Sequence, residues 1–234
     1  MESELIATKD NYITSSNPTL CTPTITSIRI GEDNDSVRIL RALIQFDLSG
    51  IPFDATIVSA VLSMYRWFEK SDHTRTMRVF RIKRDWEETE TSWNEFSTGN
   101  SWETAGCGGS NDREQTDIGY LSLDSSTLGW FDFQLDNSKV QELLTGGVFQ
   151  NNGFLLKNDT ELDDSSKFYS SNYDEDTSRR LKLTIEYSTP NPEPDPVGYK
   201  FIGNVPDIME YHASVRIRAA RRDTFLRTKK KGGV

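Results

Sequence analysis

Acidic side chains are the most numerous groups in this sequence that could do chemistry. The segment DWEETE, residues 85–90, places four carboxylates within six residues. Two carboxyl groups held a set distance apart could act as the acid and the base of glycoside hydrolysis. No signature of a cleft accompanies the segment, so we expect a solvated acidic turn and no catalytic role.

The same residue types could instead hold a hard cation. Calcium takes several carboxylate and carbonyl oxygens, often from loops. The candidate ligands of a structural calcium are Asp10, Asp85 and Glu87, and their spacing matches no EF-hand loop. Further candidates are Asn11, Asp174, Glu175 and Asp176. We favour the alternative interpretation, which is a set of charged loops without a metal.

Aromatic side chains offer a different kind of site. An exposed ring can stack on the apolar face of a pyranose sugar, which is how β-sandwich modules commonly hold carbohydrate. We expect Trp67, Trp102 and Tyr173 to bind carbohydrate, and Trp93 is a further candidate. Trp102 is the best candidate because it lies in a long polar loop, residues 97–117, where a core position is less natural.

Other chemistries lack a motif. The two cysteines and two histidines are scattered without the spacing of a zinc site. The glycines of residues 106–109 are not followed by the lysine and helix of a phosphate-binding loop. Cys21 and Cys107 could form one disulfide or none, because a chain of 234 residues needs no such crosslink.

The elements that must position these groups are mostly strands. Residues 41–65 predict strand, turn and strand, because two apolar runs flank Gly50 and Pro52. Many short segments of this kind predict an all-β fold, for which we expect a jelly-roll β-sandwich. The expected strands span 4–14, 25–30, 37–47, 57–68, 77–83, 119–123, 130–135, 152–157, 167–171 and 181–187. One short helix is expected at 137–144, capped by Asn137 or Ser138.

Alternating prolines interrupt this pattern near the end of the chain. The segment TPNPEPDP, residues 189–196, has the composition of an extended, semi-rigid spacer. We therefore expect a sandwich domain at 1–188, a Pro-rich linker at 189–197 and a basic tail at 198–234. The tail predicts a helix from about 206 to 227, with a strand at 213–219 as the alternative.

Charge is unevenly distributed along the chain. The net charge is −9, yet the residues from Val197 onward carry +6, so the remainder carries −15. Basic side chains could contact nucleic-acid phosphates or an acidic protein surface. We favour docking to protein, since only Phe225 lies among them to stack on bases. The expected anchoring residues are Arg216, Arg218, Arg221, Arg222, Lys229, Lys230 and Lys231.

No segment has the pattern of a targeting signal or of a membrane span. The start, MESELIATKDNYI, has neither a basic n-region nor an apolar h-region, so we see no signal peptide. No run approaches the ~18 apolar residues of a transmembrane helix. The protein then stays inside the cell, leaves by lysis or another signal-less route, or has been trimmed of its signal. Of the possible locations we expect a virion surface or the extracellular space.

An ordered series of short motifs resembles a known family. TKDNYI is followed by RALIQFDLSGIP, ATIVSAVLSMY, VFRI, DWEETETSW, NNGFLLK, KFYSS and LTIEY. This series, over residues 5–188, resembles the DNRLRE-type β-sandwich domain, also classed as carbohydrate-binding module family 96 and related to the disaggregatase domains. The resemblance implies a jelly-roll fold, carbohydrate binding in some members, extracellular or surface-exposed use, and no catalysis. It also implies core positions for Trp86, Trp93 and Trp130.

These observations together predict a non-catalytic structural or surface-attachment protein. We expect the sandwich to face outward, where a surface polysaccharide could be its ligand. The tail would anchor it to protein partners in a larger assembly, such as a phage virion with capsid-decoration or tail-associated proteins, or to further copies of the chain. The alternatives are a free carbohydrate-binding module of a secreted polysaccharide-processing or adhesion system, and a polysaccharide-active enzyme.

Overall fold

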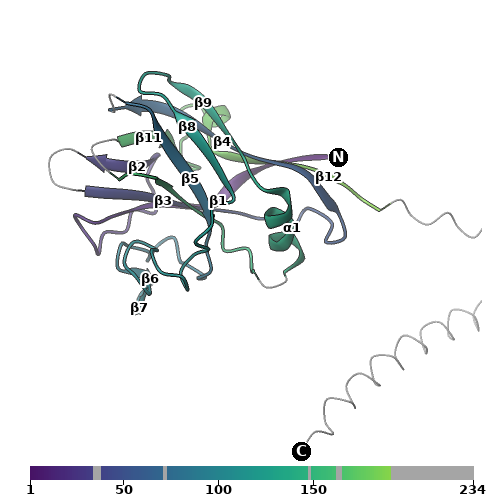
Figure 1. Ribbon diagram of the computed structural model, residues 1–234, viewed down its shortest axis with the longest axis horizontal. Helices are drawn as coiled ribbons and strands as arrows, with labels where there is room; N and C mark the ends of the chain where they lie inside the picture. The colour runs from purple at the N-terminus through teal and green to yellow at the C-terminus, as the bar shows by residue number, and fades with distance from the viewer. Residues whose placement is uncertain (34–37, 71–72, 147–148, 162–164, 191–234) are drawn as a thin grey trace, which may run out of the picture. The chain divides into compact units, whose positions relative to one another are not determined.

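The computed structural model describes residues 1–33, 38–70, 73–146, 149–161 and 165–190. Within these ranges the fold is all-β with one short α-helix, which confirms the predicted class (Figure 1). The strands are β1 (Glu2–Thr14), β2 (Ser27–Asp33), β3 (Arg38–Phe46), β4 (Thr56–Glu69), β5 (Arg75–Arg81), β6 (Glu95–Ser97), β7 (Asn100–Ser101), β8 (Gly119–Leu123), β9 (Gly129–Gln134), β10 (Phe154–Asn158), β11 (Ser165–Tyr169) and β12 (Lys182–Ser188). The helices are α1 (Asn137–Thr145) and the 3-10 turn η1 (Thr177–Arg179).

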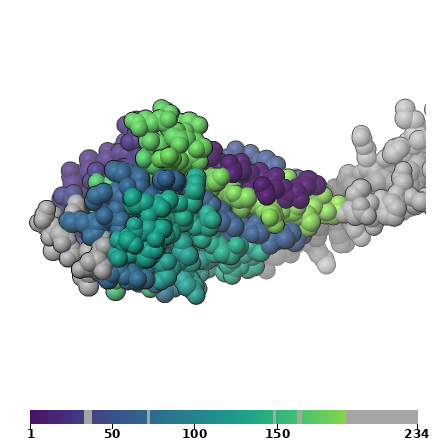
Figure 2. Space-filling view, turned by 90° about the horizontal axis from the view of Figure 1, so that it is seen from above, coloured from purple at the N-terminus to yellow at the C-terminus, as the bar shows by residue number. Residues whose placement is uncertain are grey.

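The main sheet has ten antiparallel strands, and its pairings close into a ring. The order β1-β12-β4-β11-β2-β3 returns to β1, because β1 pairs with β12 through residues 2–6 and with β3 through residues 7–14. An irregularity between Ala7 and Lys9 marks the change of partner. Figure 2 shows the purple N-terminal strand lying alongside the yellow-green end of β12. The predicted all-β class thus takes the form of a barrel-like sheet. The assignment to the jelly-roll type stays a prediction.

The ring strands β4 and β3 also pair with strands outside the ring, and these pairings form the outer surfaces described below. The strand β4 pairs with β12 and β11 along one edge and with β9 along the other. The strand β3 pairs with β1 along one edge and with β2 and β10 along the other, and β10 continues to β5 and β8. The predicted strand, turn and strand at 41–65 is confirmed, since β3 ends at Phe46 and β4 begins at Thr56.

The main core collects side chains from one face of the ring strands and also from β5, β8, β9, β10 and α1. Alternate residues of each strand point to the same side of a sheet. Ala42, Ile44 and Phe46 of β3, with Leu62 and Met64 of β4, are therefore buried together in the larger hydrophobic cluster. The intervening residues of both strands face the opposite side, where two different surfaces form.

A second hydrophobic cluster lies on the outer side of β1, β3, β10 and β5. Residues 83–117, which include β6 and β7 and are called the cover below, bury Ile13, Leu43 and Leu155 under Trp86 and Trp102. The cover also buries Phe80, Ile82 and Cys107. The predicted long polar loop at 97–117 is present, but it folds over an apolar surface.

Tight backbone geometry fits the cover to the sheet. Gly106 has a φ of +78°, and a Cβ there would lie 2.7 Å from the Trp93 ring. The next residue, Cys107, is buried with a φ of 57°. Cys107 and Cys21 are both free thiols, so of the two alternatives left open by the sequence the one without a disulfide holds.

The helix α1 confirms the predicted helix with a different cap. The carboxylate of Asp136 accepts from Ser138 N at 2.9 Å and from Lys139 N at 3.2 Å. The prediction of Asn137 or Ser138 as the cap is wrong by one or two positions, since both already lie inside the helix. Gly146, with a φ of 60°, ends it in the left-handed conformation that glycine tolerates.

The described residues form one compact unit, Met1–Pro190. The predicted tail helix and the greater part of the linker lie outside the described residues, so the proposed domain boundaries stay predictions. The expected anchoring residues that also lie outside them are Arg216, Arg218, Arg221, Arg222, Lys229, Lys230 and Lys231. In the described ranges, no helix has the length and apolar character needed to cross a membrane.

Candidate functional site

Aromatic rings gather on the outer side of β4 and β11. Tyr65 and Trp67 are two residues apart on β4 and so share a face of the sheet. The ring of Tyr169 from β11 lies against both, with centroid distances of 5.7 Å to Tyr65 and 5.9 Å to Trp67. The interplanar angles of 29° and 17° show that the three rings are stacked.

Two further rings lengthen this stack. Trp130 of β9 meets Tyr65 edge-on, with centroids 5.5 Å apart and an interplanar angle of 86°. Tyr173, from the loop after β11, stacks on Tyr169 at 3.7 Å. The five side chains Trp130, Tyr65, Tyr169, Tyr173 and Trp67, called the aromatic ladder below, thus span three strands and one loop.

The loop that carries Tyr173 is held by polar contacts at both ends. Ser171 N donates to the buried carboxylate of Asp10 at 2.7 Å. Arg180 Nε donates to the carbonyl of Tyr173 at 2.9 Å. Between them, the side chain of Asp176 caps η1 by accepting from Ser178 N. The position of Tyr173 is therefore fixed by the fold around it.

The ladder is graded in its exposure to solvent. Trp130 is 39% exposed, whereas Tyr173 is 9% exposed. Tyr65, Trp67 and Tyr169 lie between these limits as half-buried side chains. One end of the ladder is therefore open to a ligand, while the other end is fixed in the protein.

Cations lie over the faces of these rings. The guanidinium carbon of Arg179 is 4.8 Å from the centroid of Tyr65, and Lys182 Nζ is 5.1 Å from that of Trp130. Lys167 Nζ is 5.4 Å from the centroid of Trp67. Such contacts stabilise the rings by about 0.5–1 kcal/mol each at exposed sites.

Carboxylates at the rim complete the site. Lys182 Nζ is 2.7 Å from Glu4, and Arg179 Nε is 2.9 Å from Asp176. The Tyr173 hydroxyl is 3.3 Å from Glu175. Hydrogen bonding with Tyr169, together with burial and the charges of Tyr169 and Glu175, raises the pKa of Tyr173 above its usual value. The site therefore combines apolar ring faces with donors and acceptors at their edges.

The predicted carbohydrate-binding residues separate into two groups. Trp67 and Tyr173 are brought together, because both contact Tyr169. Trp102 lies elsewhere: it is 4% exposed, and its indole N–H donates to the carbonyl of Ser92 at 2.9 Å. The expectation that Trp102 presents its ring at the surface is wrong, because the cover packs it into the second cluster.

The other tryptophans also differ in their surroundings. Trp86 is fully buried, as expected, and its indole N–H donates to Asn152 O at 2.9 Å. Trp93 is half-buried against the second cluster, beneath the guanidinium of Arg41 at 4.9 Å. The core position expected for Trp130 is wrong, since β9 is an edge strand that turns this ring outward.

Sequence reasoning missed Tyr65, Tyr169 and Trp130. A local signal exists for the first, because Tyr65 and Trp67 alternate along a predicted strand. No local signal places Tyr169 between them. That contact depends on the register of β11, in which Phe168 pairs with Arg66.

The three main candidate calcium ligands, Asp10, Asp85 and Glu87, do not lie together. Asp10 is fully buried, whereas Asp85 and Glu87 are exposed, and Glu87 lies 3.8 Å from Lys9. Asn11 Oδ1 accepts from Thr22 Oγ1 at 2.6 Å. The remaining candidates contact protein groups: Asp174 pairs with Arg180, Glu175 with Tyr173, and Asp176 with Arg179. No group of three or more His, Cys, Asp or Glu able to hold a metal occurs in the described part of the chain, and structural calcium stays a prediction.

The acidic segment at 85–90 takes part in local structure. Glu88 Oε1 accepts from Asp10 N at 2.8 Å, and Glu90 Oε2 accepts from Thr98 N at 2.9 Å. Burial raises the pKa of Asp10 to about 6, and the charge of Glu88 adds to this effect. These carboxylates connect β1, the cover and the loop that carries Tyr173.

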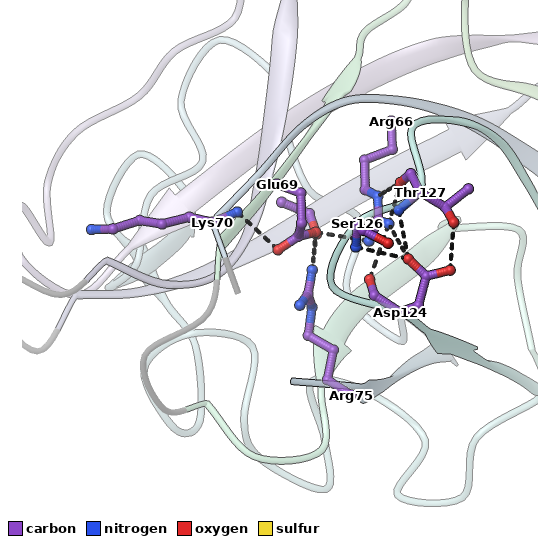
Figure 3. A network of polar contacts seen from close by, with 8 residues as sticks. Arg66, Glu69, Lys70, Arg75, Asp124, Ser126 and Thr127 are labelled. Atoms are coloured by element: carbon purple, nitrogen blue, oxygen red, sulfur yellow. Dashed lines mark hydrogen bonds and ion pairs between the residues drawn. The ribbon is translucent and has the colours of Figure 1, made fainter. Parts of the chain in front are cut away.

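Figure 3 shows a network of polar contacts around Arg66, on the strand that also carries Tyr65 and Trp67. Arg66 lies between Tyr65 and Trp67 in sequence, so its side chain points to the other side of β4. Its Nη1 donates to Glu69 at 2.7 Å and its Nε donates to Thr127 O at 2.8 Å. Asp124 holds the same turn by accepting from Ser126 N and Thr127 N. The network fixes the β8–β9 turn, from which β9 carries Trp130 to the ladder.

Fold and site together define an all-β domain with an aromatic surface built across three strands. The family model for the disaggregatase related repeat domain matches residues 10–185. The chain belongs to this family, and the match contains every residue of the aromatic ladder. No curated protein matches the sequence.

Proposed function

We propose that this domain binds carbohydrate through the aromatic ladder and does not catalyse a reaction. The observation that carries the proposal is the row of stacked, partly exposed rings that ends in Trp130. Sugar rings present C–H groups that pack on aromatic faces, while their hydroxyls need donors and acceptors nearby. The rim supplies these through Arg179, Glu175 and Lys182.

The likeness to DNRLRE-type domains and to carbohydrate-binding module family 96 supports the same proposal, and so does the jelly-roll fold expected for them. A binding role without catalysis is also supported by the acidic segment, whose Glu88 and Glu90 hold backbone N–H groups. We place the domain in a structural or surface-attachment protein, on a virion or outside the cell. The alternative is a free carbohydrate-binding module of a secreted system.

A glycan array followed by titration calorimetry tests the binding proposal. Trp130→Ala removes the most exposed ring of the ladder and should weaken binding of the selected glycan by roughly tenfold or more, given the energy of aromatic stacking. Tyr120→Ala is the matched control, because Tyr120 is 63% exposed on β8 and lies outside the ladder. An array without any hit, or equal affinities for the two variants, would contradict the proposal.

The attachment role is tested separately by light scattering. We expect the full chain to form a larger assembly with partner protein or with itself, whereas residues 1–190 should remain monomeric. This outcome is expected because the basic residues of the tail are absent from the shorter chain. If both chains are monomeric and neither takes up a partner, the free binding module becomes the better proposal.

A further inference from the structure

A groove lies between the β3–β4 turn, residues 47–55, and the helix α1. Its volume is about 640 Å³, and most of its lining is apolar: Leu48, Ile51, Pro52, Phe53, Leu143 and Leu144. Leu48, Ile51 and Leu143 are buried, whereas Phe53 is 79% exposed. An exposed aromatic side chain beside an apolar groove is typical of a surface that contacts another molecule.

Hydrogen bonds hold the two walls of this groove together. The side chain of Gln141 on α1 accepts from Ile57 N at 2.8 Å and donates to the carbonyl of Ala55 at 3.0 Å. Asn151, which also lines the groove, donates from Nδ2 to the carbonyl of Phe46 at 2.8 Å. The groove is therefore formed by the fold itself, so apolar side chains could enter it without a rearrangement.

The groove is acidic as well as apolar. Asp47 lines it and Asp54 follows Phe53 in the sequence, and both carboxylates are exposed. Hydrogen bonding with Ser49 lowers the pKa of Asp47, so this carboxylate is charged at neutral pH. Among the described residues that line the groove, none is a lysine or an arginine. The complementary occupant is a peptide segment that carries both apolar side chains and positive charge.

The C-terminal tail of this chain has that composition. From Val197 onward the sequence carries a net charge of +6, whereas the residues before it carry −15. A helix over 206–227, as the sequence predicts, would place Ile208, Val215 and Leu226 on one face. The alternating prolines of residues 189–196 predict a semi-rigid spacer, which favours a groove on another copy over the groove of the same chain.

We propose that this groove binds the C-terminal tail, residues 197–234, of a second copy of the chain. The inference rests on the attachment role proposed above and names the surface that receives the tail. Apolar side chains of the tail would pack on Leu48, Ile51 and Phe53, and its basic side chains would face Asp47 and Asp54. Because groove and tail are different surfaces, the contact is heterologous and adds copies head to tail.

Sedimentation velocity of the full chain over a range of concentrations tests this contact. We expect a reversible series of dimers and larger oligomers at about 0.05 M NaCl, and weaker association at about 0.5 M NaCl because salt screens the charges. Phe53→Ala should raise the dissociation constant by roughly tenfold, since an apolar anchor is lost. Tyr120→Ala removes a similarly exposed ring on β8, away from the groove, and should leave the constant unchanged.

A mixing experiment identifies the two surfaces that meet. A full-length variant with Arg216→Gln, Arg218→Gln, Arg221→Gln and Arg222→Gln, called the arginine variant, keeps the groove and loses much of the charge of the tail. Phe53→Ala keeps the tail and weakens the groove. At a concentration where neither variant associates alone, their mixture should form a heterodimer, because it restores one intact groove and one intact tail.

A full chain that stays monomeric at every concentration would overturn the inference, including the case in which the tail covers the groove of its own chain. A dimer that persists in the arginine variant would also overturn it, because such a contact does not use the charge of the tail. Equal effects of Phe53→Ala and Tyr120→Ala would exclude the groove. The attachment role survives these outcomes if the full chain still joins a different partner protein, and it fails if the chain joins none.

Discussion

The two outer surfaces of this sheet place the same kinds of side chain in opposite settings. On the β3–β10–β5 side, the cover closes over the strands and buries Trp86 and Trp102 in a second core. On the β9–β4–β11 side, Trp130, Tyr65 and Trp67 remain partly exposed. Trp130 meets Tyr65 edge-on, and Tyr65 and Trp67 both stack on Tyr169. The comparison shows that a tryptophan becomes core or surface according to the segment that packs over it. The residues next to it in the sequence do not decide this.

The largest loss of stability is expected from a substitution in the covered surface. Trp86→Ala removes a fully buried ring and leaves the carbonyl of Asn152 without its donor. Large-to-small substitutions of buried aromatic residues lower the free energy of unfolding by about 3–5 kcal/mol. Urea denaturation followed by circular dichroism measures this loss. A loss below about 1 kcal/mol would show that the cover adds little to stability.

A smaller, pH-dependent effect on the free energy of unfolding is expected at Asp10, whose contacts connect the two surfaces. Burial raises its pKa from 3.8 to about 6 in the folded protein. The folded state therefore binds the proton more tightly than the unfolded state, and this contribution to stability is complete below about pH 4. It is lost as the pH rises through 6, with a total of about 3 kcal/mol.

Asp10→Asn should abolish this pH dependence, because an amide does not titrate in the range. Its oxygen can still accept from Ser171 N, the contact that holds the loop of Tyr173. The variant is therefore expected to be more stable than the natural protein at pH 8 and about equal to it at pH 4. Thermal melts from pH 4 to 8 measure the difference, and parallel profiles for the two proteins would contradict the assignment.

The strands could be predicted from the sequence because their signals are local. Gly50 and Pro52 mark the turn between β3 and β4. The alternation of apolar residues on either side indicates which face of each strand is buried. The cap of α1 was misplaced because Asp136, Asn137 and Ser138 are all good capping residues. Propensity alone cannot choose among three such neighbours, whereas the backbone geometry of the helix start can.

The candidate site could be predicted only in part, since it depends on long-range register. Trp67 and Tyr173 were identified by residue type, but their common neighbour Tyr169 reaches them through the pairing of β11 with β4. Trp102 was misassigned because its neighbours in sequence are polar. Its burial comes from Leu43, Leu155 and other residues of the second cluster, which are distant in sequence.

The smallest effect on stability is expected at the open surface. Trp130→Ala removes a ring that is 39% exposed and touches Tyr65 by its edge. Little apolar area is lost from the core, so the free energy of unfolding should fall by less than about 1 kcal/mol. Urea denaturation under the conditions used for Trp86→Ala gives a direct comparison of the two surfaces. If Trp130→Ala destabilised the protein as much as Trp86→Ala, the ladder would be a structural element like the cover. A small loss of stability combined with a large loss of glycan affinity is the outcome that separates a binding surface from a core.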